Sequence, residues 1–163
     1  KSTTRLMKRI FIIFTVTVAM IVAASCEKYE DGRPAKDIRA EFEKMYPDAW
    51  DVEWERYRDG GWVVSFETGR WPDGTDRKAF YDKYGNWVQT ITEVLLADVP
   101  QNIMNYLQES DYGPAQFEDN DAEYFETQSG DDFYRFDLVM GGREMDVDVN
   151  SNGEVTPATY GYF

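Results

Sequence analysis

The side chains that could do chemistry in this sequence are almost all carboxylates. The chain has 163 residues, with 31 Asp and Glu, 17 Lys and Arg, one Cys and no His. Without histidine there is no Ser-His-Asp or Cys-His relay and no imidazole ligand for zinc. Adjacent acids such as Asp146 and Asp148 could form a glycosidase-type pair, but 31 acids produce such neighbours by chance. Since the sequence also lacks a nucleophile elbow and a phosphate-binding loop, it favours a protein that is not an enzyme.

The acids also bear on metals and on nucleic acids. Residues 148–153, read Asp-Val-Asn-Ser-Asn-Gly, imitate the start of a calcium-binding loop, but the twelfth position is Thr159 where the motif requires Glu. An Asn-rich hairpin turn explains the same residues, so we expect no metal site and no cofactor, with weak cation binding by the acidic surface as the alternative. The formal net charge of -14 argues against nucleic acid as a partner.

The first 26 residues have the layout of a secretory signal peptide. Lys8 and Arg9 precede an apolar run over residues 10–22, which is too short to span a bilayer. Small residues follow, and the segment ending at Cys26 resembles the lipobox of bacterial lipoproteins. That resemblance implies lipidation of Cys26 and a lipid anchor in the outer membrane, facing the periplasm or the cell surface. The alternative is an ordinary secreted protein with an incidental free cysteine. Residues 27–35 have no apolar period and predict a flexible tether.

The rest of the chain contains an internal repetition. The motif Asp-Val-Glu-Trp at residues 51–54 returns as Asp-Ala-Glu-Tyr at residues 121–124, and residues 81–87 align with residues 149–155. The matches occur in the same order and at nearly the same spacing. The sequence therefore predicts two copies of one unit, over residues 36–97 and 98–163.

Each copy begins with an amphipathic helix and continues with strands. Apolar residues at helical spacing are Ile38, Phe42 and Met45 in the first copy, and Ile103, Met104 and Leu107 in the second, where Asp98 can cap and Pro100 suits an early position. After each helix the apolar period becomes two, and Gly-containing turns separate the segments, at residues 59–61, 84–86, 141–142 and 152–153. The pattern predicts an α+β fold in which each copy is a helix followed by about four antiparallel strands, with both helices on one face of a sheet.

These motifs resemble a known family. Residues 46–49 (Tyr-Pro-Asp-Ala), 51–54, 81–87 (Tyr-Asp-Lys-Tyr-Gly-Asn-Trp) and Val99-Pro100 are similar to the PepSY-like family of exported bacterial proteins, also described as β-lactamase-inhibitor-like. The resemblance covers nearly all of the chain after the signal. It implies a tandem repeat of helix and four-stranded sheet whose open face grips a partner protein. The second copy departs from the pattern, since Val155 stands where Trp87 stands in the first.

The face of the sheet turned away from the helices is the predicted binding surface. Strand parity places large apolar side chains on it beside charges, which is typical of recognition surfaces. The residues that we expect to contact a partner are Tyr57, Val63, Phe80, Val88, Phe133, Arg135 and Val139. The simpler interpretation is scattered exposed apolar residues, which every protein has.

The five tryptophans invite a ligand-cage interpretation. Trp50, Trp54, Trp62 and Trp87 have the parity of core residues, whereas Trp71 lies in a loop, residues 69–74, where a large aromatic can anchor a partner. The sequence thus predicts an exported, non-catalytic binding module for an unknown envelope or extracellular protein, possibilities being hydrolase inhibition or scaffolding. A small-ligand or peptide sensor is the alternative.

Overall fold

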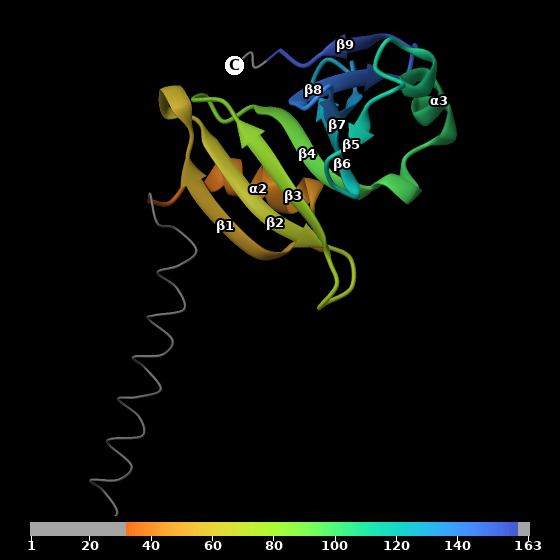
Figure 1. Cartoon of the computed structure of the whole chain (residues 1–163). Coiled ribbons are helices and arrows are strands. Elements are labelled where there is room, and N and C mark those ends of the chain that lie inside the picture. The colour runs from red at the N-terminus through yellow and green to blue at the C-terminus, as the bar shows by residue number, and fades with distance from the viewer. Residues whose placement is uncertain (1–31, 160–163) are drawn as a thin grey trace, which may run out of the picture.

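A computed structural model describes residues 32–159 of the chain (Figure 1). The predicted signal peptide, Cys26 and residues 27–31 of the predicted tether lie outside the described residues. Within the described range no helix has the length and apolar character needed to cross a membrane.

Two α-helices lie at the predicted places, α2 (Lys36–Met45) and α3 (Gln101–Glu109). Each buries two residues of its predicted stripe, Ile38 and Phe42 in α2, and Ile103 and Leu107 in α3. The predicted cap by Asp98 is wrong. Asp98 ends the short 3-10 helix η3 (Leu96–Asp98), and the N-cap position of α3 is occupied two residues later by Pro100, whose carbonyl accepts the first helical hydrogen bond.

Nine antiparallel strands form one continuous sheet. Its order is β1-β2-β3-β4-β6-β7-β8-β9, and the two-residue β5 pairs with the far end of β7 beside β6. The strands are β1 (Trp50–Arg56), β2 (Trp62–Thr68), β3 (Thr75–Tyr81), β4 (Trp87–Leu95), β5 (Gln116–Phe117), β6 (Asp121–Thr127), β7 (Phe133–Met140), β8 (Arg143–Asn150) and β9 (Val155–Pro157). The predicted α+β class is correct, and the second helix is followed by five strands where about four were expected.

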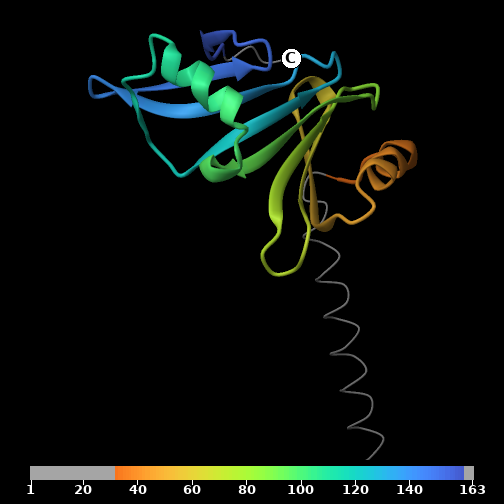
Figure 2. The same cartoon turned by 90° about the vertical axis from the view of Figure 1, so that its right-hand side faces the viewer.

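Both helices pack against the same face of this sheet. The register carries one face across the strands, from Val64 to Ala79 to Thr90 in the first half and from Phe136 to Val147 in the second. These apolar residues belong to two separate cores, one under α2 and one under α3. Figures 1 and 2 show the helices at opposite ends of the molecule, each against its own half of a sheet that bends between them. The other face of the sheet carries no helix.

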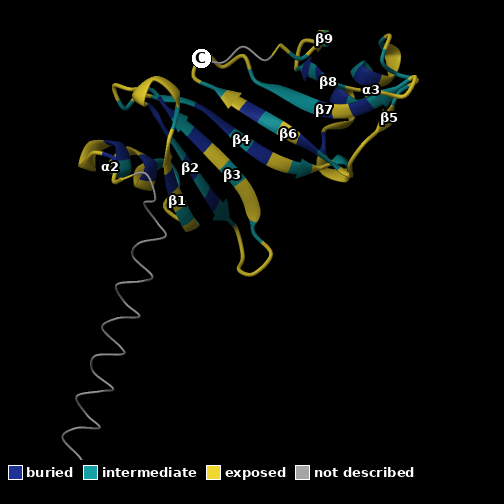
Figure 3. Ribbon diagram, turned by 60° about the vertical axis from the view of Figure 1, so that its left-hand side comes forward, coloured by how far each residue is buried: buried dark blue, intermediate teal, exposed yellow. Residues whose placement is uncertain are grey.

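Buried and exposed residues alternate along the strands as predicted (Figure 3). Trp54 and Trp62 are core residues, and Trp87 is half-buried and packs against the first core. Trp50 departs from the prediction because β1 has a bulge between Trp50 and Glu53, with Asp51 at a φ of 52°. Trp50 is therefore only half-buried, and its ring reaches the loop after β2, where a Cβ on Gly74 would lie 2.6 Å from it.

The turns after β3 and after β8 have the same construction, 68 residues apart. Asp82 Oδ1 accepts hydrogen bonds from the backbone N–H groups of Tyr84 and Asn86, as Asn150 Oδ1 does from Asn152 and Glu154. The predicted hairpin turns are confirmed. The carboxylate of Asp82, expected on the binding face, instead closes its own turn. At residues 148–153 the side chain of Asn150 is likewise engaged by the backbone.

Each of these turns also touches the helix of its own half of the sheet. Gly85 and Gly153 both have a left-handed φ, 88° and 85°. A Cβ on Gly85 would lie 2.7 Å from Ile38 Cγ1 in α2, and one on Gly153 would lie 3.1 Å from Tyr106 Cε1 in α3. Glycine is therefore required twice over, by the backbone conformation and by the close approach of the helix.

Candidate functional site

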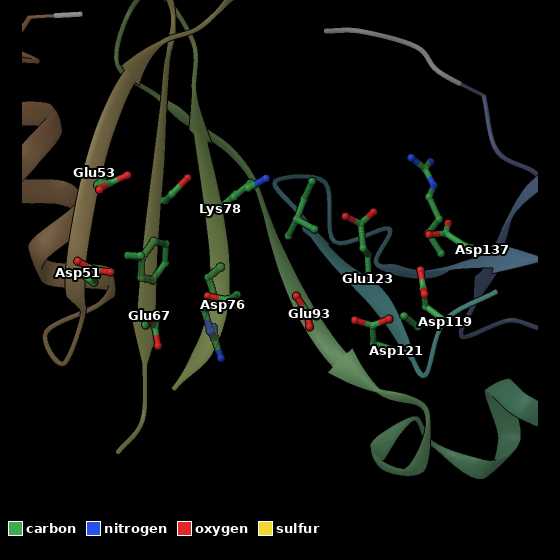
Figure 4. Close-up of a pocket in the computed structure, with 16 residues that line it drawn as sticks. Asp51, Glu53, Glu67, Asp76, Lys78, Glu93, Asp119, Asp121, Glu123 and Asp137 are labelled. Carbon is green, nitrogen blue, oxygen red and sulfur yellow. The ribbon is translucent and has the colours of Figure 1, made fainter. Parts of the chain in front are cut away.

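The helix-free face of the sheet forms a groove of about 440 Å³. Its walls come from both halves of the sheet, β1 to β4 on one side and β6, β7 and the residues before β6 on the other, and Figure 4 shows acidic side chains from the two sides directed into it. Nine carboxylates line the groove: Asp51, Glu53, Glu67, Asp76, Glu93, Asp119, Asp121, Glu123 and Asp137. Only three basic residues join them, Arg77, Lys78 and Arg135.

The strand register brings carboxylates directly opposite one another on this face. Glu67 faces Asp76 between β2 and β3, and Glu93 faces Glu123 between β4 and β6. Asp137 faces Asp146 between β7 and β8. Like charges directly opposite in an antiparallel pair destabilise the sheet. The groove therefore holds repulsion that a cationic partner would relieve.

The crowding of carboxylates shifts their protonation equilibria. The pKa of Glu93 is raised by its contact with the Asp121 carboxyl, by loss of solvent and by the charges of Asp121, Asp76 and Glu123. Loss of solvent, followed by the charge of Asp146, raises the pKa of Asp137. The pKa of Glu123 is raised in the same way, with Asp137 as the main neighbouring charge, while Arg135 and Lys78 oppose the shift. All three shifts disfavour the charged form at its own site.

Arg135 is the cation most firmly held in the groove. Its Nε and Nη2 donate to the two carboxylate oxygens of Asp148 at 2.7 and 2.9 Å, which is bidentate geometry. The guanidinium lies 4.6 Å from the ring centroid of Phe125 and 5.6 Å from that of Phe133, and these two rings are stacked at 4.6 Å. Phe125 is therefore only 5% exposed although it lies on the helix-free face.

An apolar hollow of about 480 Å³ lies at one end of the first half of the sheet. Tyr57, Phe80 and Val88 line it, and the rings of Tyr57 and Phe80 meet edge to face at 5.2 Å. The exposed Tyr84 lies at its rim with Lys83, whose Nζ is 5.1 Å from the centroid of that ring.

The structure divides the predicted partner-binding residues among separate places. Phe133 and Arg135 lie together in the groove face, and Tyr57, Phe80 and Val88 lie together in the hollow. Val63 is the register neighbour of Phe80, while Val139 pairs with the short β5 and with Glu144 of β8. Trp71 is 73% exposed in the loop between β2 and β3.

The sequence-based prediction missed most of the groove. Glu53, Glu67 and Asp137 have the expected outward parity, but Glu93, Asp121 and Glu123 were not singled out. Their signal was present, because Glu93 and Glu123 alternate with the inward residues Thr92, Val94 and Ala122 along β4 and β6. Phe125 was missed because an aromatic in an alternating strand is normally assigned to the helix side.

Comparison with known proteins establishes the fold. The chain matches a BLIP-like protein from Bacteroides fragilis with a TM-score of 0.62 and 22% identity, over 80% of this chain and 90% of that one. The chain has a BLIP-like fold. It also matches a DUF2874 family protein from Bacteroides uniformis, with a TM-score of 0.64 and 21% identity over 80% and 94% of the two chains. A third structure with this fold, from Bacteroides eggerthii, is provisionally named as periplasmic and matches with a TM-score of 0.63 and 17% identity over 76% and 86%.

No family model matches the chain, and no curated protein matches it. The BLIP-like fold agrees with the β-lactamase-inhibitor-like half of the predicted resemblance. Membership of the PepSY-like family stays a prediction.

Proposed function

We propose that this protein is a non-catalytic binding module whose groove receives a positively charged surface of another protein. The observation that carries the proposal is the set of carboxylates placed opposite one another on the helix-free face, Glu93 against Glu123 and Asp137 against Asp146. Electrostatic complementarity of this kind fixes orientation and speeds association. The BLIP-like fold supports the proposal as an analogy, since the name of one structural relative refers to inhibition of another protein.

The cations in the groove do not neutralise it. Arg135 is committed to Asp148 by two hydrogen bonds, which leaves Lys78 and Arg77 against nine lining carboxylates. A partner that brings Lys or Arg side chains into the groove would pair them with carboxylates that now repel each other. Hydrolase inhibition and scaffolding are two uses of such a surface.

The apolar hollow favours the second candidate, a small-ligand or peptide sensor. Its two facing rings, Tyr57 and Phe80, could hold one apolar side chain or a small aromatic molecule. The hollow lies on the same face as the groove, because Phe80 and Lys78 have the same strand parity. A protein partner could therefore use both features at once.

We further propose that the module works outside the cytoplasm, tethered through Cys26, and that its two halves are copies of one unit. The signal-like segment and lipobox-like residues support the first statement. The matching turns at Gly85 and Gly153 support the second. Metabolic labelling with a fatty acid tests the anchor: we expect incorporation into the full chain and none into Cys26→Ala, and an unlabelled full chain would contradict it.

The groove proposal is tested with an octalysine peptide, titrated calorimetrically into the protein at low ionic strength. The groove variant neutralises three lining acids: Glu93→Gln, Glu123→Gln and Asp137→Asn. A matched control removes the same charge from exposed acids on or after α2, across the sheet: Glu41→Gln, Glu43→Gln and Asp48→Asn.

We expect the groove variant to lose about tenfold or more in affinity and the control to lose much less, because screening confines the effect to nearby charges. Equal losses in both variants would mean that net charge alone attracts the peptide, and the groove would then have no special role.

A further inference from the structure

Two contacts in the groove join carboxyl groups to each other. The side chains of Glu93 and Asp121 lie within hydrogen-bonding contact, and so do those of Asp137 and Asp146. A carboxylate can only accept a hydrogen bond, so such a contact requires one proton shared by the two groups. Each pair therefore behaves as a single unit that takes up its first proton more readily than an isolated carboxyl would.

The surroundings of Glu93 strengthen this tendency. Across β6 it meets Asp121 and Glu123, and across β3 it meets Asp76. The groups of opposite charge on this side are Lys78 and Arg77 on β3.

Asp137 is surrounded in the same way. On β8 it meets Asp146, with Asp148 and Glu144 on the same strand, and its other carboxylate neighbours are Asp119, Asp121, Glu118 and Glu123. Arg135, on the same strand as Asp137, is held by Asp148. Repulsion from several sides favours protonation of the pair.

We propose that the Glu93–Asp121 and Asp137–Asp146 pairs are a proton-operated switch, which discharges the groove in mildly acidic solution and releases a cationic partner. Each pair takes one proton from solvent, so the groove loses two negative charges without any change of fold. The absence of His from the sequence leaves carboxyl pairs as the side chains suited to sensing pH in this range. The release of the partner rests on the proposed function, whereas proton uptake by the pairs does not.

The titration is observed directly by NMR of the side-chain carboxyl carbons in the full described domain. We expect the carboxyl resonances of Glu93 and Asp137 to titrate above the ordinary range of about 3.9 to 4.3, and those of the exposed Glu43 to titrate within it. In Asp121→Asn and Asp146→Asn the partner carboxyl is removed, so the midpoints of Glu93 and Asp137 should fall towards the ordinary range. Ordinary midpoints for both groups in the unaltered protein would overturn the switch.

The consequence for binding is measured with octalysine at about pH 7.5 and about pH 5. We expect roughly tenfold weaker binding at the lower pH. The double variant Glu93→Gln, Asp137→Asn should bind weakly at both pH values, with a difference of about threefold or less. A full pH effect in this variant would overturn the assignment to these pairs. If octalysine binds at neither pH while the raised midpoints are observed, the groove proposal and the partner release fail, and the proton-uptake step stands alone.

Discussion

Removal of the Arg135 guanidinium should destabilise the fold as well as the groove. Arg135→Met keeps the aliphatic length but leaves the Asp148 carboxylate without its bidentate partner, at a site where the two side chains are 14% and 18% exposed. A charge-assisted hydrogen bond contributes about 1.5 to 3 kcal/mol. The guanidinium also covers Phe125 and Phe133, and a cation–π contact adds about 0.5 to 1 kcal/mol.

Because the pair is mostly but not fully buried, we expect a loss of about 2 to 3 kcal/mol in the free energy of unfolding. For a domain of this size that lowers Tm by roughly 8 to 12 °C. The assay is urea and thermal unfolding of a double-mutant cycle with Arg135→Met and Asp148→Asn, which isolates the coupling between the two side chains.

A coupling below about 0.5 kcal/mol would refute the reasoning, since the ion pair would then be worth no more than an exposed one. Arg135→Lys is a useful second variant, because it keeps the charge and loses the fork. We expect it to recover less than half of the lost stability.

Three further perturbations have outcomes that follow from the structure. Gly85→Ala should cost about 1 to 3 kcal/mol more than Gly130→Ala in denaturant unfolding, since both have a φ near 80° to 90° but only Gly85 meets a neighbour, Ile38; equal costs would show that the helix yields freely. Glu93→Gln should raise Tm by roughly 1 to 4 °C, with less gain in 1 M salt, because it removes a like-charge cross-strand pair; a lower Tm would contradict the repulsion. Trp71→Ala should change stability by no more than about 0.5 kcal/mol, since the ring is 73% exposed, and a larger loss would show that the loop is packed.

The free energy of unfolding should rise as the pH falls from neutral towards about 4. The pKa values of Glu93, Glu123 and Asp137 are raised in the folded protein, so the folded state binds more protons than the unfolded state in this window. Asp82 acts in the opposite sense, because hydrogen bonds from Asn86 lower its pKa and its contribution is lost only at lower pH. Stability measured by urea unfolding that is flat or falls between pH 7 and about 5 would contradict these signs.

The local elements were predictable because their signals are short in range. Alternation of apolar and polar residues located β2, β7 and β8, and glycines with left-handed φ marked the turns at Gly85 and Gly153. The prediction failed at Trp50, because a bulge at Asp51 shifts parity without any change in composition. It also failed at Asp98, where the Val99-Pro100 step moves the start of the helix.

The groove could not be predicted to the same extent because it depends on register and on the bend of the sheet. Glu93 and Glu123 are 30 residues apart, and only the pairing of β4 with β6 places them opposite each other. Arg135 was predicted as an exposed binding residue, yet its position across from Asp148 and beside Phe125 makes it largely structural.

The amino-acid sequence by itself determined the acidic character, the absence of imidazole chemistry, the order of helices and strands and which residues enter the two cores, because each depends on composition or on a period of a few residues. Tertiary structure decided which carboxylates meet, which aromatic is covered on the helix-free face and where the charge of the groove is concentrated. Those outcomes depend on distances between strands far apart in the chain, and charge interactions act over those distances regardless of sequence separation.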